Sequence, residues 1–100
     1  MADIGIANCT IYDSTLSSGI KELIIVTPAT ADDGDYFELV LKDYGIKTIL
    51  SQFAVVHSTA DSIVAVEDAT TSVTTGTLTV TLGSVGGTDK KRVVTIRGVC

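Results

Sequence analysis

The chain has 100 residues and a formal net charge of −5, with 45% hydrophobic residues but only 5% aromatic residues and no tryptophan. This length predicts one domain with one core. The few aromatic rings disfavour a carbohydrate-stacking surface, and the acidic balance disfavours nucleic acid as a partner because phosphates would be repelled.

The basic residues are concentrated in one segment. Residues 90–100 contain four of the seven basic residues and none of the twelve acidic ones, so the charge is −9 over 1–89 and +4 over 90–100. This segment predicts a surface that docks on an acidic partner, or alternatively a solvated strand paired with acidic neighbours in the same fold. The candidate partner interface consists of Lys90, Lys91, Arg92 and Arg97.

The composition favours strands and gives no sign of a membrane segment. Threonine occurs fifteen times, and side chains branched at Cβ pack better on a pleated sheet than in a helix. No apolar run approaches the roughly 18 residues of a membrane span. The first residues also lack the basic and apolar regions of a secretory signal, so we expect synthesis in a cytoplasm and no membrane partner.

The first third of the chain predicts two strands. Residues 4–12 are apolar enough for a short strand within a less regular segment, 1–18, which we expect to be an N-terminal arm. The β-sandwich domain is then expected over 19–100. The apolar run 21–27 predicts the next strand, which ends before Pro28 because proline cannot donate to a strand ladder.

The middle of the chain alternates between apolar and polar residues. A turn is predicted at Asp33-Gly34, followed by a strand with Phe37, Leu39 and Leu41 on one face and Glu38 and Lys42 on the other. A second turn at 43–45 leads into 46–57, which predicts one long strand or two strands joined by a bend near Ser51-Gln52.

The last third predicts three strands. Residues 62–66 form a short apolar run, residues 77–82 alternate strictly between threonine and aliphatic residues, and 92–99 is the final strand. We expect the last two to form an antiparallel hairpin. The whole pattern, about seven or eight strands at roughly ten-residue spacing, predicts an all-β fold: a single antiparallel β-sandwich or jelly-roll-like domain.

The candidate catalytic residues are too few for an enzyme. His57 is the only histidine, and although Ser58 and Asp61 are near it in sequence, a triad requires convergence in space and a nucleophile on a constrained turn. We therefore interpret His57 as a strand-end residue with a structural hydrogen bond, and we expect no catalytic residues.

The candidate ligand-binding motifs also have simpler interpretations. Asp32, Asp33 and Asp35 crowd one loop, but Gly34 comes too early for an EF-hand, so we favour a solvated acidic turn over a calcium site shared with other loops. The glycines at 83, 86 and 87 lack the motifs of a phosphate loop and are interpreted as turn residues. No cofactor or metal is expected.

The cysteines and tyrosines are interpreted as structural residues. Cys9 and Cys100 form no C-x-x-C motif, and we favour two reduced thiols over a disulfide between the terminal strands. The three tyrosines are expected at sheet edges or interfaces, where the ring is buried and the hydroxyl is wet: Tyr12, Tyr36 and Tyr44.

Four segments together resemble a family of viral proteins. They are TPATADDGD (27–35), LKDYGIKTI (41–49), GTLTVTLG (76–83) and KKRVVTIRG (90–98). Over about residues 20–100 the chain resembles the small β-rich proteins encoded beside the major capsid protein in tailed bacteriophages. This resemblance implies a capsid decoration or cement protein with a β-sandwich or jelly-roll fold and no catalytic residues.

The resemblance also implies a partner and a place. Such proteins clamp neighbouring subunits of the major capsid protein on the outer surface of the phage head, often as trimers. We therefore expect a homo-oligomer, most simply a trimer, located in the virion and made in the host cytoplasm. A neck or tail component, or a host-directed β-sandwich that binds a ligand through its loops, is the alternative.

Overall fold

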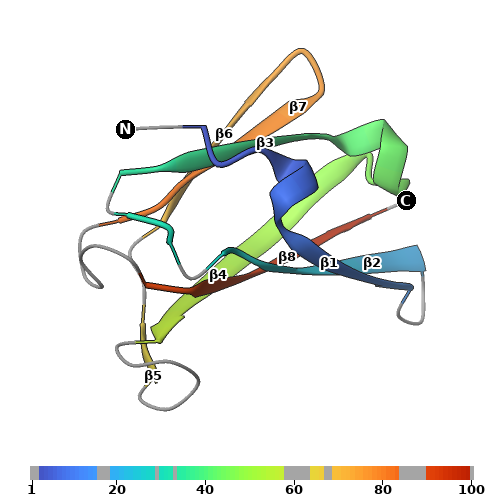
Figure 1. The fold of residues 1–100 in the computed structure, drawn as a ribbon. Coiled ribbons are helices and arrows are strands. Elements are labelled where there is room, and N and C mark those ends of the chain that lie inside the picture. Colours follow the sequence, from blue (N-terminus) through green and yellow to red (C-terminus); the bar gives the residue numbers. More distant parts are fainter. Residues whose placement is uncertain are drawn as a thin grey trace.

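The chain folds into two antiparallel sheets that lie face to face (Figure 1). The computed structural model describes residues 3–15, 19–28, 30–32, 34–57, 64–66, 69–83 and 90–99. Its strands are β1 (Thr10–Thr15), β2 (Ile20–Val26), β3 (Tyr36–Val40), β4 (Thr48–His57), β5 (Val64–Val66), β6 (Thr70–Thr74), β7 (Thr77–Thr81) and β8 (Arg92–Val99). The larger sheet has the order β1-β2-β8-β4-β5 and the smaller sheet β3-β7-β6, which confirms the predicted all-β sandwich.

The core lies between the two sheets and follows the predicted alternation. In β3, Phe37 and Leu39 are buried while Glu38 is exposed, and in β7 Leu78 and Val80 are buried between less buried threonines. The buried apolar residues are Leu23, Ile25, Ala31, Phe37, Leu39, Leu41, Ile46, Ala54, Val56, Ala69, Leu78, Val80, Leu82, Val94 and Ile96. Each sheet therefore buries one face against the other.

The first segment connects the two sheets. Near its start, the N–H of Ile4 donates to the carbonyl of Tyr36 in β3 at 2.8 Å. The chain then passes through a 3₁₀ helix, η1 (Ile6–Asn8), to β1, which pairs with β2 (Figure 1). The strand expected over 4–12 is therefore wrong in its first half, because Gly5 adopts a left-handed φ of 81° and the extended chain resumes at Thr10. The domain boundary after residue 18 stays a prediction.

The long strand β4 contains the bend that was expected near Ser51. Its pairing with β8 shifts between Ile49 and Ser51, so Leu50 is an extra residue in a β-bulge. Before β4, the chain forms a second 3₁₀ helix, η3 (Leu41–Tyr44), which ends at the left-handed Gly45. This turn aims Ile46 into the core and brings Thr48 beside β8.

The expected hairpin between 77–82 and 92–99 is wrong. Strand β7 pairs with β3 on one side and β6 on the other, whereas β8 pairs with β2 and β4 in the larger sheet. Leu82 continues the smaller sheet by donating its N–H to the carbonyl of Asp35 at 2.7 Å. Since both edges of β7 are occupied, the chain after it crosses to the other sheet.

The hairpin of the smaller sheet joins β6 and β7. Thr75 and Gly76 both have positive φ values, 50° and 75°, as a tight type I′ turn requires. Sequence analysis missed β6 because all five of its side chains are exposed, so Thr70–Thr74 has no apolar alternation.

A buried glycine in the larger sheet permits a close approach of the neighbouring chain. A Cβ atom on Gly98 of β8 would lie 2.6 Å from Ile46 Cγ2 and 2.6 Å from the carbonyl oxygen of Thr48. Glycine is therefore required here by space, because real Cβ atoms do not approach backbone oxygens so closely.

We expect Gly98→Ala to lower the free energy of unfolding by about 1–3 kcal/mol, the usual cost of overpacking a core. Urea denaturation followed by circular dichroism measures this change. Gly76→Asn is the control, since nothing lies within 4 Å of a Cβ at Gly76 and asparagine tolerates its backbone conformation. Equal stability of the Gly98→Ala variant and the parent would contradict the steric argument.

Candidate functional site

The outward side of the larger sheet is the main candidate contact surface. We call it the outer face; it comprises the outward-pointing residues of β1, β2, β8, β4 and β5 in the described chain. Residues directly opposite each other in neighbouring strands share a face, so the register gives its rows. One row runs Tyr12, Ile24, Thr95 and Phe53, and the next runs Val26, Val93, Val55 and Val66.

The outer face exposes large apolar side chains. Tyr12 is 60% exposed, Phe53 58% and Val66 64%. Single exposed apolar residues are ordinary, but residues in adjacent rows of neighbouring strands form a continuous patch. Such a patch is typical of a surface that contacts another molecule.

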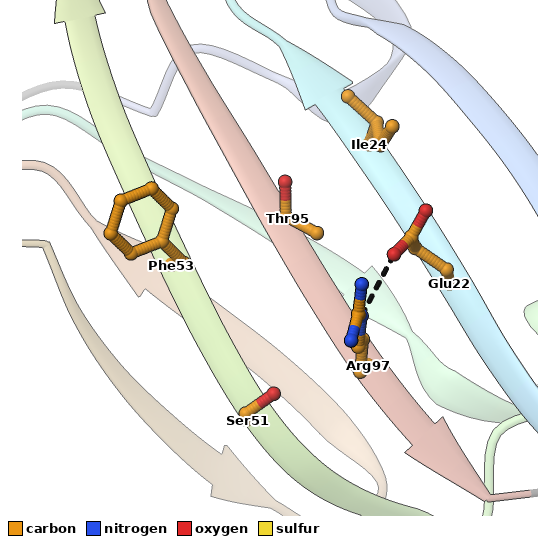
Figure 2. Close-up of a pocket in the computed structure, with 6 residues that line it drawn as sticks. All are labelled: Glu22, Ile24, Ser51, Phe53, Thr95 and Arg97. Atoms are coloured by element: carbon orange, nitrogen blue, oxygen red, sulfur yellow. Dashed lines mark hydrogen bonds and ion pairs between the residues drawn. The ribbon is translucent and has the colours of Figure 1, made fainter.

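A shallow depression lies in this face (Figure 2). It has a volume of about 390 Å³ and is lined by Glu22, Ile24, Ser51, Phe53, Thr95 and Arg97. The Nε–H of Arg97 donates to Glu22 Oε2 at 2.8 Å, so the acidic and the basic group neutralise each other within the face. Figure 2 shows these side chains projecting from one side of the adjacent strands β2, β8 and β4.

The outer face offers apolar contact area around a small polar centre. The polar groups that line the depression are the hydroxyls of Ser51 and Thr95 and the ion pair, in which the Glu22 carboxylate is bound by Arg97. Burial of aliphatic and aromatic side chains is the interaction that this arrangement can provide.

The four basic residues of the expected interface do not form one cluster. Arg92 and Arg97 begin and nearly end β8, about 17 Å apart along a strand that rises about 3.4 Å per residue. Lys90 and Lys91 are half-buried just before β8, where the N–H of Lys90 donates to the carbonyl of Ala31 at 2.9 Å. Arg97 belongs instead to the outer face.

Sequence analysis placed Arg92 in the partner interface, but its side chain is fully buried and its guanidinium is not available to a partner. Its Nη1 donates to the carbonyl of Ala31 at 2.6 Å and to that of Lys90 at 2.9 Å. Burial of a guanidinium requires such partners, because an unsolvated charge is otherwise costly. The role of Lys90, Lys91 and Arg97 in partner binding stays a prediction.

The acidic loop is structural where it is described. The expected solvated acidic turn is wrong for Asp35, which is buried. Its Oδ2 accepts a hydrogen bond from the backbone N–H of Asp32 at 2.9 Å. Asp33 lies outside the described residues. The described part of the chain contains no group of three or more metal-binding side chains.

The remaining sequence candidates take structural places. His57 is half-buried at the end of β4, the strand-end position that was expected. Its backbone N–H donates to the carbonyl of Lys91 at 2.9 Å, and Ser58 and Asp61 lie outside the described residues. Cys9 is a free thiol whose pKa is raised by burial, while Cys100 is not described. Gly83 is described just after β7, and the glycines at 86 and 87 are not.

Sequence analysis missed the apolar part of the outer face, although a signal for it exists. Leu23, Ile24, Ile25 and Val26 are four consecutive apolar residues, and a strand with one wet face would alternate instead. The tyrosine expectation is met by Tyr36, which is half-buried in the edge strand β3. Tyr12 lies in the edge strand β1 but its ring is exposed, and Tyr44 packs against the core from η3 rather than from a sheet edge.

Comparison of the chain with protein families, with curated proteins and with solved structures finds no match. No helix among the described residues is long and apolar enough to cross a membrane. The outer face and the basic residues before β8 are therefore interpreted from their own chemistry.

We expect Arg92→Met to destabilise the fold by about 1–3 kcal/mol, because the Lys90 carbonyl loses its Arg92 donor and the buried Ala31 carbonyl keeps only the N–H of Lys90. Arg97→Met is the matched control in the same strand. The side chain of Arg97 is 54% exposed, and a surface ion pair contributes about 1 kcal/mol or less. Urea denaturation of both variants provides the comparison, and equal losses would refute a structural role specific to Arg92.

Proposed function

We propose that the chain is a virion structural protein: a decoration protein that binds the outer surface of a phage head and stabilises contacts between major capsid protein subunits. The observation that carries the proposal is the exposed apolar outer face on a two-sheet scaffold. Covering such a surface with another protein removes apolar side chains from water and therefore favours assembly. The viral setting comes from the resemblance of the four segments between residues 27 and 98 to capsid decoration proteins.

The shell would strengthen weak contacts by repetition. A decoration protein meets many identical sites on one capsid, so linked copies bind far more tightly than one copy does. Self-association of this chain, as the trimer that the resemblance implies or as another oligomer, would provide that linkage. Lys90 and Lys91 lie directly before β8, at one end of the sandwich. We propose that these two residues contact an acidic surface of the capsid.

A neck or tail component is the second candidate. The observation that favours it is β6, an edge strand of the smaller sheet whose five residues are all exposed. An exposed edge can add a strand from a neighbouring chain, and repeated addition closes rings. In that case the purified protein would form rings instead of binding to shells.

Co-sedimentation with empty capsids, built from the major capsid protein encoded in the same genome, tests the proposal. We expect the parent protein to bind and the double variant Lys90→Glu/Lys91→Glu to bind at least tenfold more weakly at low salt, because the charge attraction is reversed. Lys42→Glu/Lys47→Glu makes the same charge change at exposed positions and should bind like the parent.

Failure of the parent to bind capsids at both low and moderate salt would reject the decoration function. Parent binding with equal loss in both double variants would reject only the assignment of Lys90 and Lys91. Ring-shaped particles in electron micrographs of the purified protein would support the neck or tail alternative.

A further inference from the structure

Parts of β2, β8 and β4 in the larger sheet are apolar on both sides. In β8, Val93 points to the outer face while the neighbouring Val94 is in the core, and in β4 the same holds for Val55 and Val56. Strands that are covered on both faces have this continuous apolar pattern, whereas strands with one wet face alternate. The smaller sheet covers the inner side, and nothing in the described chain covers the outer one.

We propose that the outer face is a self-association surface, on which a second copy of the chain packs its own outer face. The size of the face fits this occupant. The four longest strands of this sheet, about 4.8 Å apart, and eight residues of β8 at about 3.4 Å each span on the order of 500 Å² in projection. A standard interface removes about 800 Å² of accessible surface from each partner, and accessible area over side chains exceeds the projection.

The charges of the face also favour a second copy. At the outward positions of its described paired strands there is one acidic residue, Glu22, and one basic residue, Arg97, adjacent to each other in the same row. A strongly acidic or basic partner gains nothing from a neutral pair. An identical face can instead be turned so that each Glu22 meets an Arg97, which forms two additional attractive contacts.

One symmetry operation satisfies both the charges and the apolar rows. A two-fold axis parallel to the strands, between β2 and β8, lays β2 over β8 of the partner subunit and β1 over β4 of the partner subunit. Glu22 then lies over Arg97 of the partner subunit, because the two residues share a row in adjacent strands. By the same operation Tyr12 lies over Phe53 of the partner subunit, since these residues share a row on β1 and β4.

This packing repeats the geometry of the sandwich itself. Two sheets pack about 10 Å apart with their strands within about 30° of each other. The aromatic residues Tyr12 and Phe53, the most exposed rings of the face, are the side chains that such an interface buries first. The pair is a dimer, or the unit of a larger even-numbered assembly, in place of the free trimer that the resemblance implies. The inference does not depend on the capsid function.

Charge exchange between two variants tests the pairing. Glu22→Arg gives a face with two positive charges, and Arg97→Glu gives a face with two negative charges. We expect each variant alone to dissociate at least tenfold more readily than the parent, and an equimolar mixture to associate again. Sedimentation velocity at low salt measures the three samples. Both variants lose the Glu22–Arg97 pair within one chain, so recovery in the mixture requires contact between chains.

A second pair of variants separates the apolar contribution. Phe53→Thr should raise the dissociation constant at least tenfold, while Val73→Thr, at an exposed position of β6 on the other sheet, should leave it unchanged. Circular dichroism confirms that each variant is folded. The proposal expects a Kd of about 1 µM or lower. A parent protein that stays monomeric at about 100 µM would therefore overturn it. So would an oligomer that persists unchanged in both charge variants, or a mixture that stays dissociated.

Discussion

Strand β8 is the central strand of the larger sheet, so its register positions both neighbours, β2 and β4. A doubly paired strand must present one row of side chains to each face of its sheet. The inward row is Arg92, Val94, Ile96 and Gly98, and the outward row is Val93, Thr95, Arg97 and Val99. The core, the close approach at Gly98 and the candidate contact surface therefore all depend on the register of this strand.

The inward row ends in two unusual residues with different physical origins. Gly98 is required by space, since Ile46 and the Thr48 carbonyl occupy the position of a Cβ. Arg92 is tolerated because the loop before β3 supplies acceptors: the carbonyl of Ala31 faces its guanidinium, and the buried Asp35 brings a carboxylate to the same loop. A buried cation therefore organises an irregular loop at one end of the sandwich.

The sequence predicted elements better than their partners. Strict alternation identified the strands that contain Phe37 and Leu78, and the bend near Ser51 is a bulge. Alternation is local, whereas the choice of neighbour depends on which strand edges remain free, so the β7–β8 hairpin was wrong. The buried place of Arg92 could have been found, because it shares parity with Val94 and Ile96 in the same strand.

The edges and the outer face offer different routes to self-association. Two of the four edges are blunted: β5 has three residues, and the edge of β3 is partly occupied by the bridge between Asp3 and Tyr36. The other two, β1 and β6, are strands of six and five residues. The outer face instead extends over neighbouring strands, with its valine row running from β2 to β5. Burial of a broad apolar face contributes free energy in proportion to its area, while a short edge contributes a few backbone hydrogen bonds of about 1 kcal/mol each. Association through the face is therefore the stronger of the two routes in this fold.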